Sequence, residues 1–426
     1  MCAQNAPSDD GQDPALQSRF DNALGALLDG AAAPVIGLAV SGGGDSMGML
    51  ALAHVFAGKA GCALRVLTVD HGLRPEAADE ALMVAEVCAR LSHDHQVLRW
   101  HWKGQGNKMD AARRARLELF GKWCAGWGDV VLVAHTADDL AETYMMRLAR
   151  GSGLEGLSAM APVRKMPGYR LLRPCLGFSR SDLCTAARRF CLPIVDDPSN
   201  ADPEYARARV RALLPLLARE GLLPATLAAT AEHLREERAA LDARAVQVWR
   251  EVGREEPWGG LSFAPDWFDK TETATRRRLV NRALCYLSTA EYAPRASALE
   301  AFMAQISTGR GATLHGCAAT YLNGRLTLFR EYAALRDMSA QAGLWDGRWQ
   351  ACADLPEGVR IAALGEAGWR QITLRSGPPY RVALSLPALW QGGACLACDG
   401  LGHGPGATLR DMRHEQGGFA GFVLSR

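Results

Sequence analysis

Long apolar runs are missing from this chain of 426 residues, and so is a large net charge of either sign. No apolar run reaches the length of a membrane span, and residues 1–11 are polar, unlike the apolar centre of a signal peptide. We therefore expect a soluble, cytoplasmic protein with no membrane partner. Because 48 basic and 46 acidic side chains leave a formal net charge of only +2, any nucleic-acid-binding surface must be local.

Cysteine patterns typical of metal sites are also scarce. Only Cys395 and Cys398 form a CxxC pair, and a tetrahedral metal site with four ligands needs a second pair that the sequence does not supply. Other cysteines, such as Cys62 and Cys88, are scattered through apolar segments, which is typical of free thiols in a reducing compartment. We therefore interpret the CxxC pair as structural.

The composition and the first half of the chain indicate an α/β protein. Hydrophobic residues make up 48% and charged residues 22% of the chain, which is enough for two or three domains with cores. From Pro34 to about Val195, short β-branched runs alternate with longer helical patterns, as in βαβ units of a parallel sheet. This pattern predicts a doubly wound α/β domain over 31–215, after an N-terminal extension over 1–30. The predicted strands are Val35–Val40, Leu64–Val69, Gln96–Trp102 and Asp129–Ala134, and the predicted helices are Met47–Phe56, Ala77–Leu91, Asp110–Cys124 and Asp138–Leu148.

The pattern changes after Pro198. Long helical segments at Tyr205–Arg219 and Pro224–Arg254 predict a helical domain over 216–335, with strand candidates only near its end. Glycine and proline then mark the turns of a small β-rich domain over 345–426. The predicted architecture is a doubly wound parallel sheet followed by a helical domain and a small β-rich C-terminal domain.

The most informative segment is Ser41–Ser46, with the sequence Ser-Gly-Gly-Gly-Asp-Ser, between the first predicted strand and the first predicted helix. Consecutive glycines let the backbone turn tightly and point several N–H groups at one spot, where the helix N-terminus adds partial positive charge. These features predict a phosphate site, since a flexible linker has no reason to join a buried strand to a buried helix. The segment lacks the Gly-Lys-Ser/Thr of a Walker loop and the spacing of GxGxxG, which disfavours both of those nucleotide-binding classes.

Acidic side chains gather where the fourth predicted strand ends. His135 follows that strand, and Asp138, Asp139 and Glu142 open the next helix, Asp138 and Glu142 sharing one helix face. Carboxylates at the carboxyl end of a parallel strand can hold Mg²⁺ on ATP or receive an ammonium group. The alternative is that these acids only complement the helix dipole, since acids are common in a first turn.

A basic stretch follows, and it could track the phosphates of an RNA. The alternative interpretation is a charged face in contact with solvent. The arginines of this stretch are Arg173, Arg180, Arg188, Arg189, Arg207, Arg209 and Arg211.

Several of these segments resemble the N-type ATP pyrophosphatases of the PP-loop superfamily, and among them the tRNA(Ile)-lysidine synthase family. Ser41–Ser46 fits the SGGxDS motif of that superfamily, whose enzymes adenylate a carbonyl or amide oxygen and release pyrophosphate. The resemblance covers about the first 220 residues strongly, although Thr136 replaces a family histidine and Ala208 a family asparagine. Similarity to lysidine synthases is carried by Val69–Arg74, Asn107–Leu117, Ala134–Thr143, Arg150–Met160, Arg173–Leu176 and Asp196–Asn200.

The resemblance implies an adenine nucleotide alpha hydrolase-like fold, ATP and Mg²⁺ as cofactors, and a two-step reaction. In this reaction ATP adenylates the C2 oxygen of the wobble cytidine of a tRNA(Ile) with a CAU anticodon. The ε-amine of free L-lysine then displaces AMP, forming lysidine and changing codon specificity from AUG to AUA. The implied catalytic residues are Asp45, His135, Asp138 and Glu142; the ATP-binding residues are Ser41, Gly42, Gly43, Gly44, Asp45, Ser46, Asp70 and Arg113; Asp45 also meets Mg²⁺ through the phosphates; and the substrate- or tRNA-binding residues are Asp139, Arg173, Arg207 and Arg211.

Two alternative functions stay open at this point, as does the choice of the general base among the acids. A tRNA-thiolating enzyme of the same superfamily would need a CxxC near the catalytic domain to carry sulfur or an iron–sulfur cluster, whereas Cys395 and Cys398 lie far along the chain. A non-catalytic nucleotide-binding scaffold would use the helical arm only to dock partners. The sequence also leaves the oligomeric state open, with a homodimer as one option.

Overall fold

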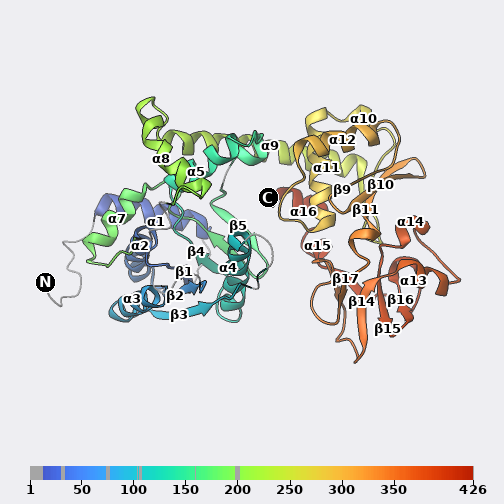
Figure 1. The fold of residues 1–426 in the computed structure, drawn as a ribbon, viewed down its shortest axis with the longest axis horizontal. Coiled ribbons are helices and arrows are strands. Elements are labelled where there is room, and N and C mark those ends of the chain that lie inside the picture. Colours follow the sequence, from blue (N-terminus) through green and yellow to red (C-terminus); the bar gives the residue numbers. More distant parts are fainter. Residues whose placement is uncertain are drawn as a thin grey trace. The chain divides into compact units, whose positions relative to one another are not determined.

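The computed structural model describes residues 13–29, 34–72, 77–102, 104, 108–158, 160–196 and 202–425. The chain divides into two compact units, one ending at Arg238 and the other beginning at Ala239 (Figure 1). Parts of four segments that carry the family resemblance, at 73–74, 107, 159 and 197–200, lie outside the described residues. Across the described ranges, no single helix is long and apolar enough to cross a membrane, and one bent helix pair, Ala206–Arg219 with Pro224–Val252, passes by length and composition only.

The first unit is built on a six-stranded sheet in the order β3-β2-β1-β4-β6-β5. Five strands run parallel, and β5 pairs with β6 in the antiparallel direction. The predicted parallel α/β fold is therefore confirmed. The strands are β1 (Val35–Ala39), β2 (Ala63–Asp70), β3 (Asp94–Arg99), β4 (Val130–Leu132), β5 (Val163–Met166) and β6 (Tyr169–Leu172).

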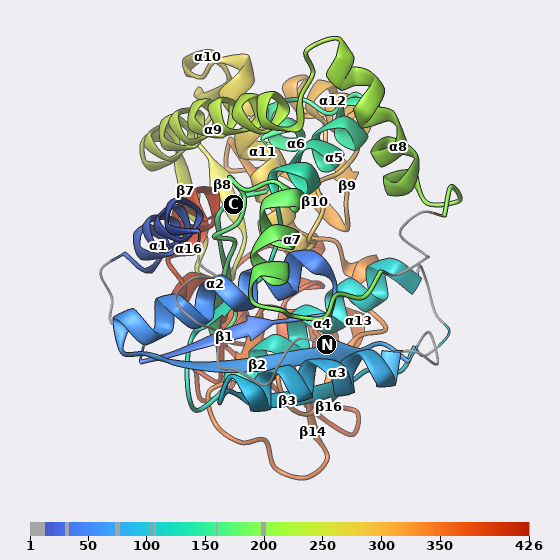
Figure 2. The ribbon, with the colours of Figure 1, turned by 90° about the vertical axis from the view of Figure 1, so that its left-hand side faces the viewer.

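Helices cover both faces of this sheet, as Figures 1 and 2 show. Side chains of α2, α3 and α7 share one core with β1, while α4 packs with β2, β4 and β6 in a second core. Both faces of the central strands are buried, which explains why Val130–Leu132 is apolar throughout. The helices are α2 (Gly44–Ala60), α3 (Ala77–Arg90), α4 (Lys108–Cys124), α5 (Ala137–Leu148), α6 (Leu154–Leu157), α7 (Arg180–Arg189) and α8 (Ala206–Arg219).

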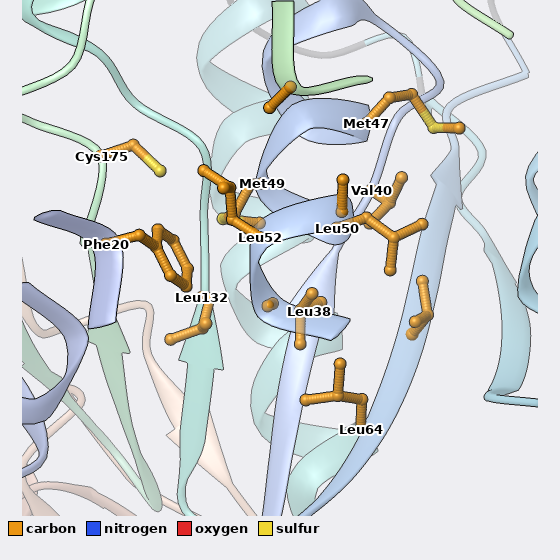
Figure 3. Packing of buried hydrophobic residues seen from close by; sticks show 14 of the residues in the cluster. Phe20, Leu38, Val40, Met47, Met49, Leu50, Leu52, Leu64, Leu132 and Cys175 are labelled. Atoms are coloured by element: carbon orange, nitrogen blue, oxygen red, sulfur yellow. The ribbon is translucent and has the colours of Figure 1, made fainter. Parts of the chain in front are cut away.

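A further helix, α1 (Pro14–Leu28), packs on the first core. Asp13 caps its N-terminus by accepting hydrogen bonds from two backbone N–H groups, and Phe20 and Leu24 are fully buried. Figure 3 shows Phe20 beside Leu52 of α2 and Leu132 of β4. The described part of the predicted N-terminal extension is thus a helix that completes the core, and the boundary at residue 30 stays a prediction.

The predicted elements match those of the structure closely, with differences at the ends. The predicted third strand runs to Trp102, whereas β3 ends at Arg99. The hairpin of β5 and β6 was not predicted, because both strands are only four residues long. In addition, β5 has two consecutive basic residues in its middle and so lacks a clear alternation of apolar and polar residues.

The second unit contains a five-stranded antiparallel sheet in the order β7-β8-β11-β10-β9. Helices α11 and α12 and the end of α9 bury their apolar side chains against it. The helix α16, from the end of the chain, contributes Phe419 and Val423 to the same core. These elements are α9 (Pro224–Val252), β7 (Gly253–Glu255), β8 (Leu261–Phe263), α10 (Trp267–Lys270), α11 (Thr273–Ser288), α12 (Ala296–Ser307), β9 (Ala312–Leu314), β10 (Cys317–Leu322), β11 (Arg325–Arg330) and α16 (Gly418–Leu424).

A four-stranded and a two-stranded sheet make up the rest of this unit. Cys395 and Cys398 are buried in the core of the four-stranded sheet as free thiols. The domain boundaries at 215/216 and 335/345 stay predictions. The elements are η3 (Tyr332–Ala334), β12 (Ser339–Ala340), β13 (Trp349–Ala351), β14 (Val359–Ala363), α13 (Gly365–Gln371), α14 (Tyr380–Ala383), β15 (Pro387–Gln391), β16 (Ala394–Ala397), η4 (Asp399–Leu401), β17 (Leu409–Asp411) and α15 (Met412–Glu415).

Candidate active site

The strand order of the first unit locates the site. β1 lies between β2 and β4, so the order of the sheet reverses between β1 and β4, which pair directly. In open α/β sheets, ligands bind beyond the carboxyl ends of strands at such a reversal. Ser41–Ser46 follows β1 and His135–Asp139 follows β4, so the two predicted functional segments meet at this edge.

The glycine-rich loop is held in one conformation. Gly42 has a φ of +86°, in the left-handed region that glycine occupies without strain. The Ser46 hydroxyl donates to the Gly43 carbonyl oxygen at 2.9 Å and accepts from the Ser41 N–H at 3.1 Å. Within the described residues, no side chain caps α2 at Gly43. The N–H groups of the first turn are therefore placed to bind an anion.

Close packing of α2 on α7 brings the start of α7 to this loop (Figure 2). A Cβ atom on Gly44 would lie 2.5 Å from the Cys184 sulfur, and one on Gly48 would lie 2.1 Å from the Leu183 carbonyl oxygen. Two glycines of α2 thus permit an approach that larger residues would prevent. Arg180, the first residue of α7, lies beside Asp45 of α2 as a result.

The start of α5 is fixed by a capping box between Thr136 and Asp139. The Thr136 N–H donates to Asp139 Oδ2 at 3.0 Å, and the Asp139 N–H donates to the Thr136 hydroxyl at 3.3 Å. This arrangement orients the acids of the first turn. Threonine at position 136, where the resembling family has a histidine, thus serves as the helix cap.

Arg180 contacts four of the five acids predicted for the site, all except Asp70. Its Nε donates to Asp45 Oδ2 at 3.2 Å, and its NH2 group lies 3.4 Å from both Asp139 Oδ1 and Glu142 Oε1. Its backbone N–H donates to Asp138 Oδ2 at 2.8 Å. The guanidinium of Arg180, which the sequence placed in a basic stretch that could track RNA phosphates, faces carboxylates in this structure, and an RNA contact stays a prediction. No local sequence pattern signals this role, because the contacts join residues 38 to 135 positions apart.

Asp45 combines burial with an unused oxygen. Burial raises the pKa of Asp45 to about 6, and the charge of Arg180 counteracts part of that rise. Asp45 Oδ1 is buried and, among the described residues, accepts no hydrogen bond. A carboxylate oxygen is the ligand type that Mg²⁺ prefers, so Asp45 fits the predicted metal contact beside a phosphate-binding loop.

Glu142 is fully buried and surrounded by arginines. Its Oε1 lies 2.7 Å from the Arg211 Nε and its Oε2 lies 3.2 Å from the Arg207 Nε, in addition to the contact with Arg180. The Arg207 contact is an ion pair whose geometry does not meet hydrogen-bond criteria. Both arginines come from α8, so this pairing ties α8 to α5. Arg207 and Arg211, predicted to bind tRNA, thus contact the acid in this structure, and their RNA contacts stay a prediction.

His135 is neutral in this environment. Burial, together with the charge of Arg173, lowers the pKa of His135 to about 3. The Arg173 Nε lies 3.3 Å from His135 Nδ1. A guanidinium group only donates, which assigns Nδ1 as the acceptor and leaves the proton on Nε2. His135 is thus arranged as a hydrogen-bond donor and not as a proton acceptor at neutral pH.

Positive charge accumulates near His135, whose pKa is lowered by burial and by the charges of Arg173, Arg116 and Arg207. Burial and the charges of Arg113 and Arg207 lower the pKa of Arg116. Its buried Nε makes no hydrogen bond within the described residues. Several guanidinium groups with one unused donor form an arrangement suited to a polyanion such as a nucleotide. Arg113 therefore lies with this cluster.

Asp70 is the predicted site residue that lies apart from the acids. Its Oδ1 accepts from the Gly72 N–H at 2.8 Å, and its Oδ2 lies 3.9 Å from the Arg99 Nε. It ends β2, beside β1 in the sheet, and no contact with Asp45 or Asp139 is found in the described ranges. The structure thus gathers the other predicted acids and leaves Asp70 at the neighbouring strand end.

The chain is built as a PP-loop protein, and comparison with known sequences agrees. The sequence profile of the PP-loop domain family matches residues 15–217. A tRNA(Ile)-lysidine synthase of Ruegeria pomeroyi is 36% identical over 391 residues, which cover 89% of this chain and 92% of that protein. The corresponding protein of Hyphomonas neptunium is 36% identical and covers 87% and 94%. That of Rhodopseudomonas palustris is 46% identical over 199 residues, which cover 46% of this chain and 58% of that protein.

Similarity at this level extends over both units and is not confined to the ATP-binding domain. The chain belongs to the tRNA(Ile)-lysidine synthase family, a group of ATP-dependent ligases.

Proposed function

We propose that this protein joins L-lysine to C2 of the wobble cytidine of a tRNA(Ile) with a CAU anticodon, through an adenylated tRNA intermediate. The observation that supports this proposal most directly is the meeting of the loop Ser41–Ser46 with the acids of α5 at the reversal of the sheet. Membership of the family, supported by 36% identity across 92% of a relative's length, selects this reaction among those that a PP-loop can perform.

In the first step, ATP lies over Ser41–Ser46 with its phosphates on the N–H groups of the loop and of α2. Asp45, whose buried Oδ1 accepts no hydrogen bond among the described residues, would hold Mg²⁺, and the ion would supply positive charge that stabilises the departing pyrophosphate. Arg113 and Arg116 add positive charge near His135. The neutral His135 would donate a hydrogen bond through its Nε2–H to an oxygen that gains negative charge, and it would keep its proton.

In the second step, the ε-amine of lysine attacks C2 and AMP departs. The amine reaches the site as an ammonium group, and a carboxylate must bind it and accept a proton. Asp138 and Asp139 sit in the first turn of α5, and Asp139 Oδ1 faces the same space as Asp45. We assign the ammonium to these two acids, because Glu142 is fully buried and paired with three arginines, whereas the Asp139 side chain remains 14% exposed.

The alternative of tRNA thiolation finds little support in the second unit. Burial raises the pKa of Cys395 to about 11 and that of Cys398 to about 12, so both thiols are protonated at neutral pH. Among the described residues, no group of three or more metal-binding side chains is found. The predicted cytoplasmic location and a homodimer as one oligomeric option stay predictions.

The proposal is tested by product analysis with ATP, lysine and an unmodified tRNA(Ile) transcript. We expect AMP and pyrophosphate to appear in equal amounts with lysine joined to RNA, and a transcript with uridine at the wobble position to give none of these products. AMP release without lysine transfer would indicate an adenylating enzyme of another specificity, and no ATP turnover at all would indicate a scaffold.

A further inference from the structure

Arg180 touches acids from two helices of the site, α2 and α5. Asp45 belongs to α2, whereas Asp139 and Glu142 belong to α5, and these two helices follow the adjacent strands β1 and β4. The guanidinium contacts Asp45 at 3.2 Å and the two α5 acids at 3.4 Å. A planar guanidinium has separate donors at fixed angles, so it can bridge several carboxylates at once.

The position of this bridge is itself rigid. Arg180 is the first residue of α7, and a capping box between Ser179 and Asp182 fixes the helix start. Its backbone N–H also holds Asp138 at 2.8 Å. Further along α7, Leu183 lies against Gly48 of α2. Side-chain and backbone contacts of one residue therefore set the spacing between the PP-loop acid and the α5 acids.

The environment distinguishes Arg180 from a surface arginine. Carboxylates in one site repel one another, and without a cation between them Asp45 and the α5 acids would separate or reorient. The Arg180 side chain is 30% exposed, and its partner Glu142 is fully buried. A guanidinium directed at three acids is not available to an RNA phosphate.

We propose that Arg180 is a positioning residue for the reaction, holding Asp45 in register with the acids of α5 so that both chemical steps use one arrangement. This inference rests on the proposed function. The inference assigns a role in the reaction to the start of α7, in addition to the roles of the loop Ser41–Ser46 and of the acids of α5.

The test compares the full-length wild type with Arg180→Gln and Arg180→Lys in steady-state lysidine formation. A misplacement of about 1 Å can lower a rate about 100-fold, so we expect Arg180→Gln to lower kcat about 100-fold. The KM values for ATP and lysine should stay within about threefold of wild type, since positioning acts mainly on the transition state. Arg180→Lys keeps the charge but loses the planar fork, and we expect a kcat about tenfold below wild type.

Arg170→Gln is the matched control. Arg170 pairs with one acid, Asp129, at the amino end of β6, away from the site. We expect wild-type kinetics from this variant. The melting temperature of each variant shows whether a lower rate reflects less folded protein or a slower reaction. If Arg180→Gln does not fold, the kcat of Arg180→Lys tests the inference.

A double-mutant cycle with Asp45→Asn gives the decisive reading. Substitutions of residues that act as a unit have non-additive effects on the rate. Adding Arg180→Gln to the Asp45→Asn enzyme should therefore lower kcat by less than about threefold. Fully additive losses, or a kcat for Arg180→Gln within twofold of wild type, would overturn the inference. Absence of lysidine formation by the wild type would instead overturn the proposed function, and pyrophosphate exchange into ATP would then test the Arg180 variants on the adenylation step alone.

Discussion

At the scale of single residues, burial acts on Asp45 and His135 in opposite directions. Burial favours the neutral form of each group, which raises the pKa of the carboxyl and lowers the pKa of the imidazole. Arg180 lowers the pKa of Asp45 toward its ordinary value, whereas Arg173 lowers that of His135 further. At neutral pH the site therefore combines an ionised acid with a neutral histidine.

His135 leads to a prediction about pH and stability. Its pKa of about 3 lies below the ordinary value of 6.5, so the unfolded chain binds the proton more strongly. The stabilising contribution of the neutral His135 to the free energy of unfolding is therefore complete above about pH 6.5 and is lost as the pH falls toward 3. Between pH 7 and 5 the loss in unfolding free energy is at most about 2 kcal/mol, at about 1.36 kcal/mol for each pH unit below 6.5, and solvent screening of the partly exposed ring reduces it.

Urea unfolding at pH 7 and pH 5 provides the measurement, with His135→Asn as the comparison. We expect the wild type to lose more stability than His135→Asn over this interval. An equal loss in the two proteins would show that His135 titrates at its ordinary pKa.

At the scale of elements, the contact between α2 and α7 carries the geometry of the site. A Cβ on Gly48 would meet the backbone of Leu183 at 2.1 Å, and a backbone oxygen cannot rotate away. We expect Gly48→Ala to lower the free energy of unfolding by about 1 to 3 kcal/mol and to lower kcat, because α7 carries Arg180. Urea unfolding and lysidine kinetics measure the two effects.

Gly58, in the same helix, is the matched control. A Cβ at Gly58 would meet no atom within 4 Å, so Gly58→Ala should raise stability by up to about 1 kcal/mol through helix propensity. Equal effects of Gly48→Ala and Gly58→Ala would contradict the close approach of α2 and α7.

Elements and site residues differ in how far the sequence predicts them. The loop Ser41–Ser46 and the first turn of α5 are local patterns, so the sequence alone pointed to both segments, and the βαβ alternation predicted a parallel sheet. The order of the strands in this sheet was not predicted. The role of Arg180 depends on the distance between α7 and two other helices, which no local pattern encodes. The helix α1 lies within the predicted N-terminal extension over 1–30, for which no helix was predicted.

At the scale of the whole molecule, the two units have separate cores, and the end of the chain belongs to the second. Phe419 of α16 is fully buried among Trp249, Tyr286 and the strands of the five-stranded sheet. Its backbone N–H also donates to Glu255 at 2.9 Å. The last residues of the chain thus complete a core whose other members lie between residues 245 and 328.

We predict that Phe419→Ala destabilises the second unit by about 3 to 5 kcal/mol, because it leaves a cavity in that core. Differential scanning calorimetry should show one transition shifted to lower temperature and the other unchanged. Leu424→Ala, at a side chain that is 57% exposed, should leave both transitions in place. A single shared transition that moves as a whole would contradict separate cores.

The measurement that tests the central claim most directly is incorporation of labelled lysine into a tRNA(Ile) transcript with ATP and Mg²⁺, by the wild type and Asp45→Asn. Asp129→Asn is the control, since Asp129 pairs only with Arg170 in the contacts described. The account predicts ATP-dependent label with the wild type and the control, and at least about 100-fold less with Asp45→Asn. Label that forms equally well with Asp45→Asn, or none with the folded wild type, would contradict it.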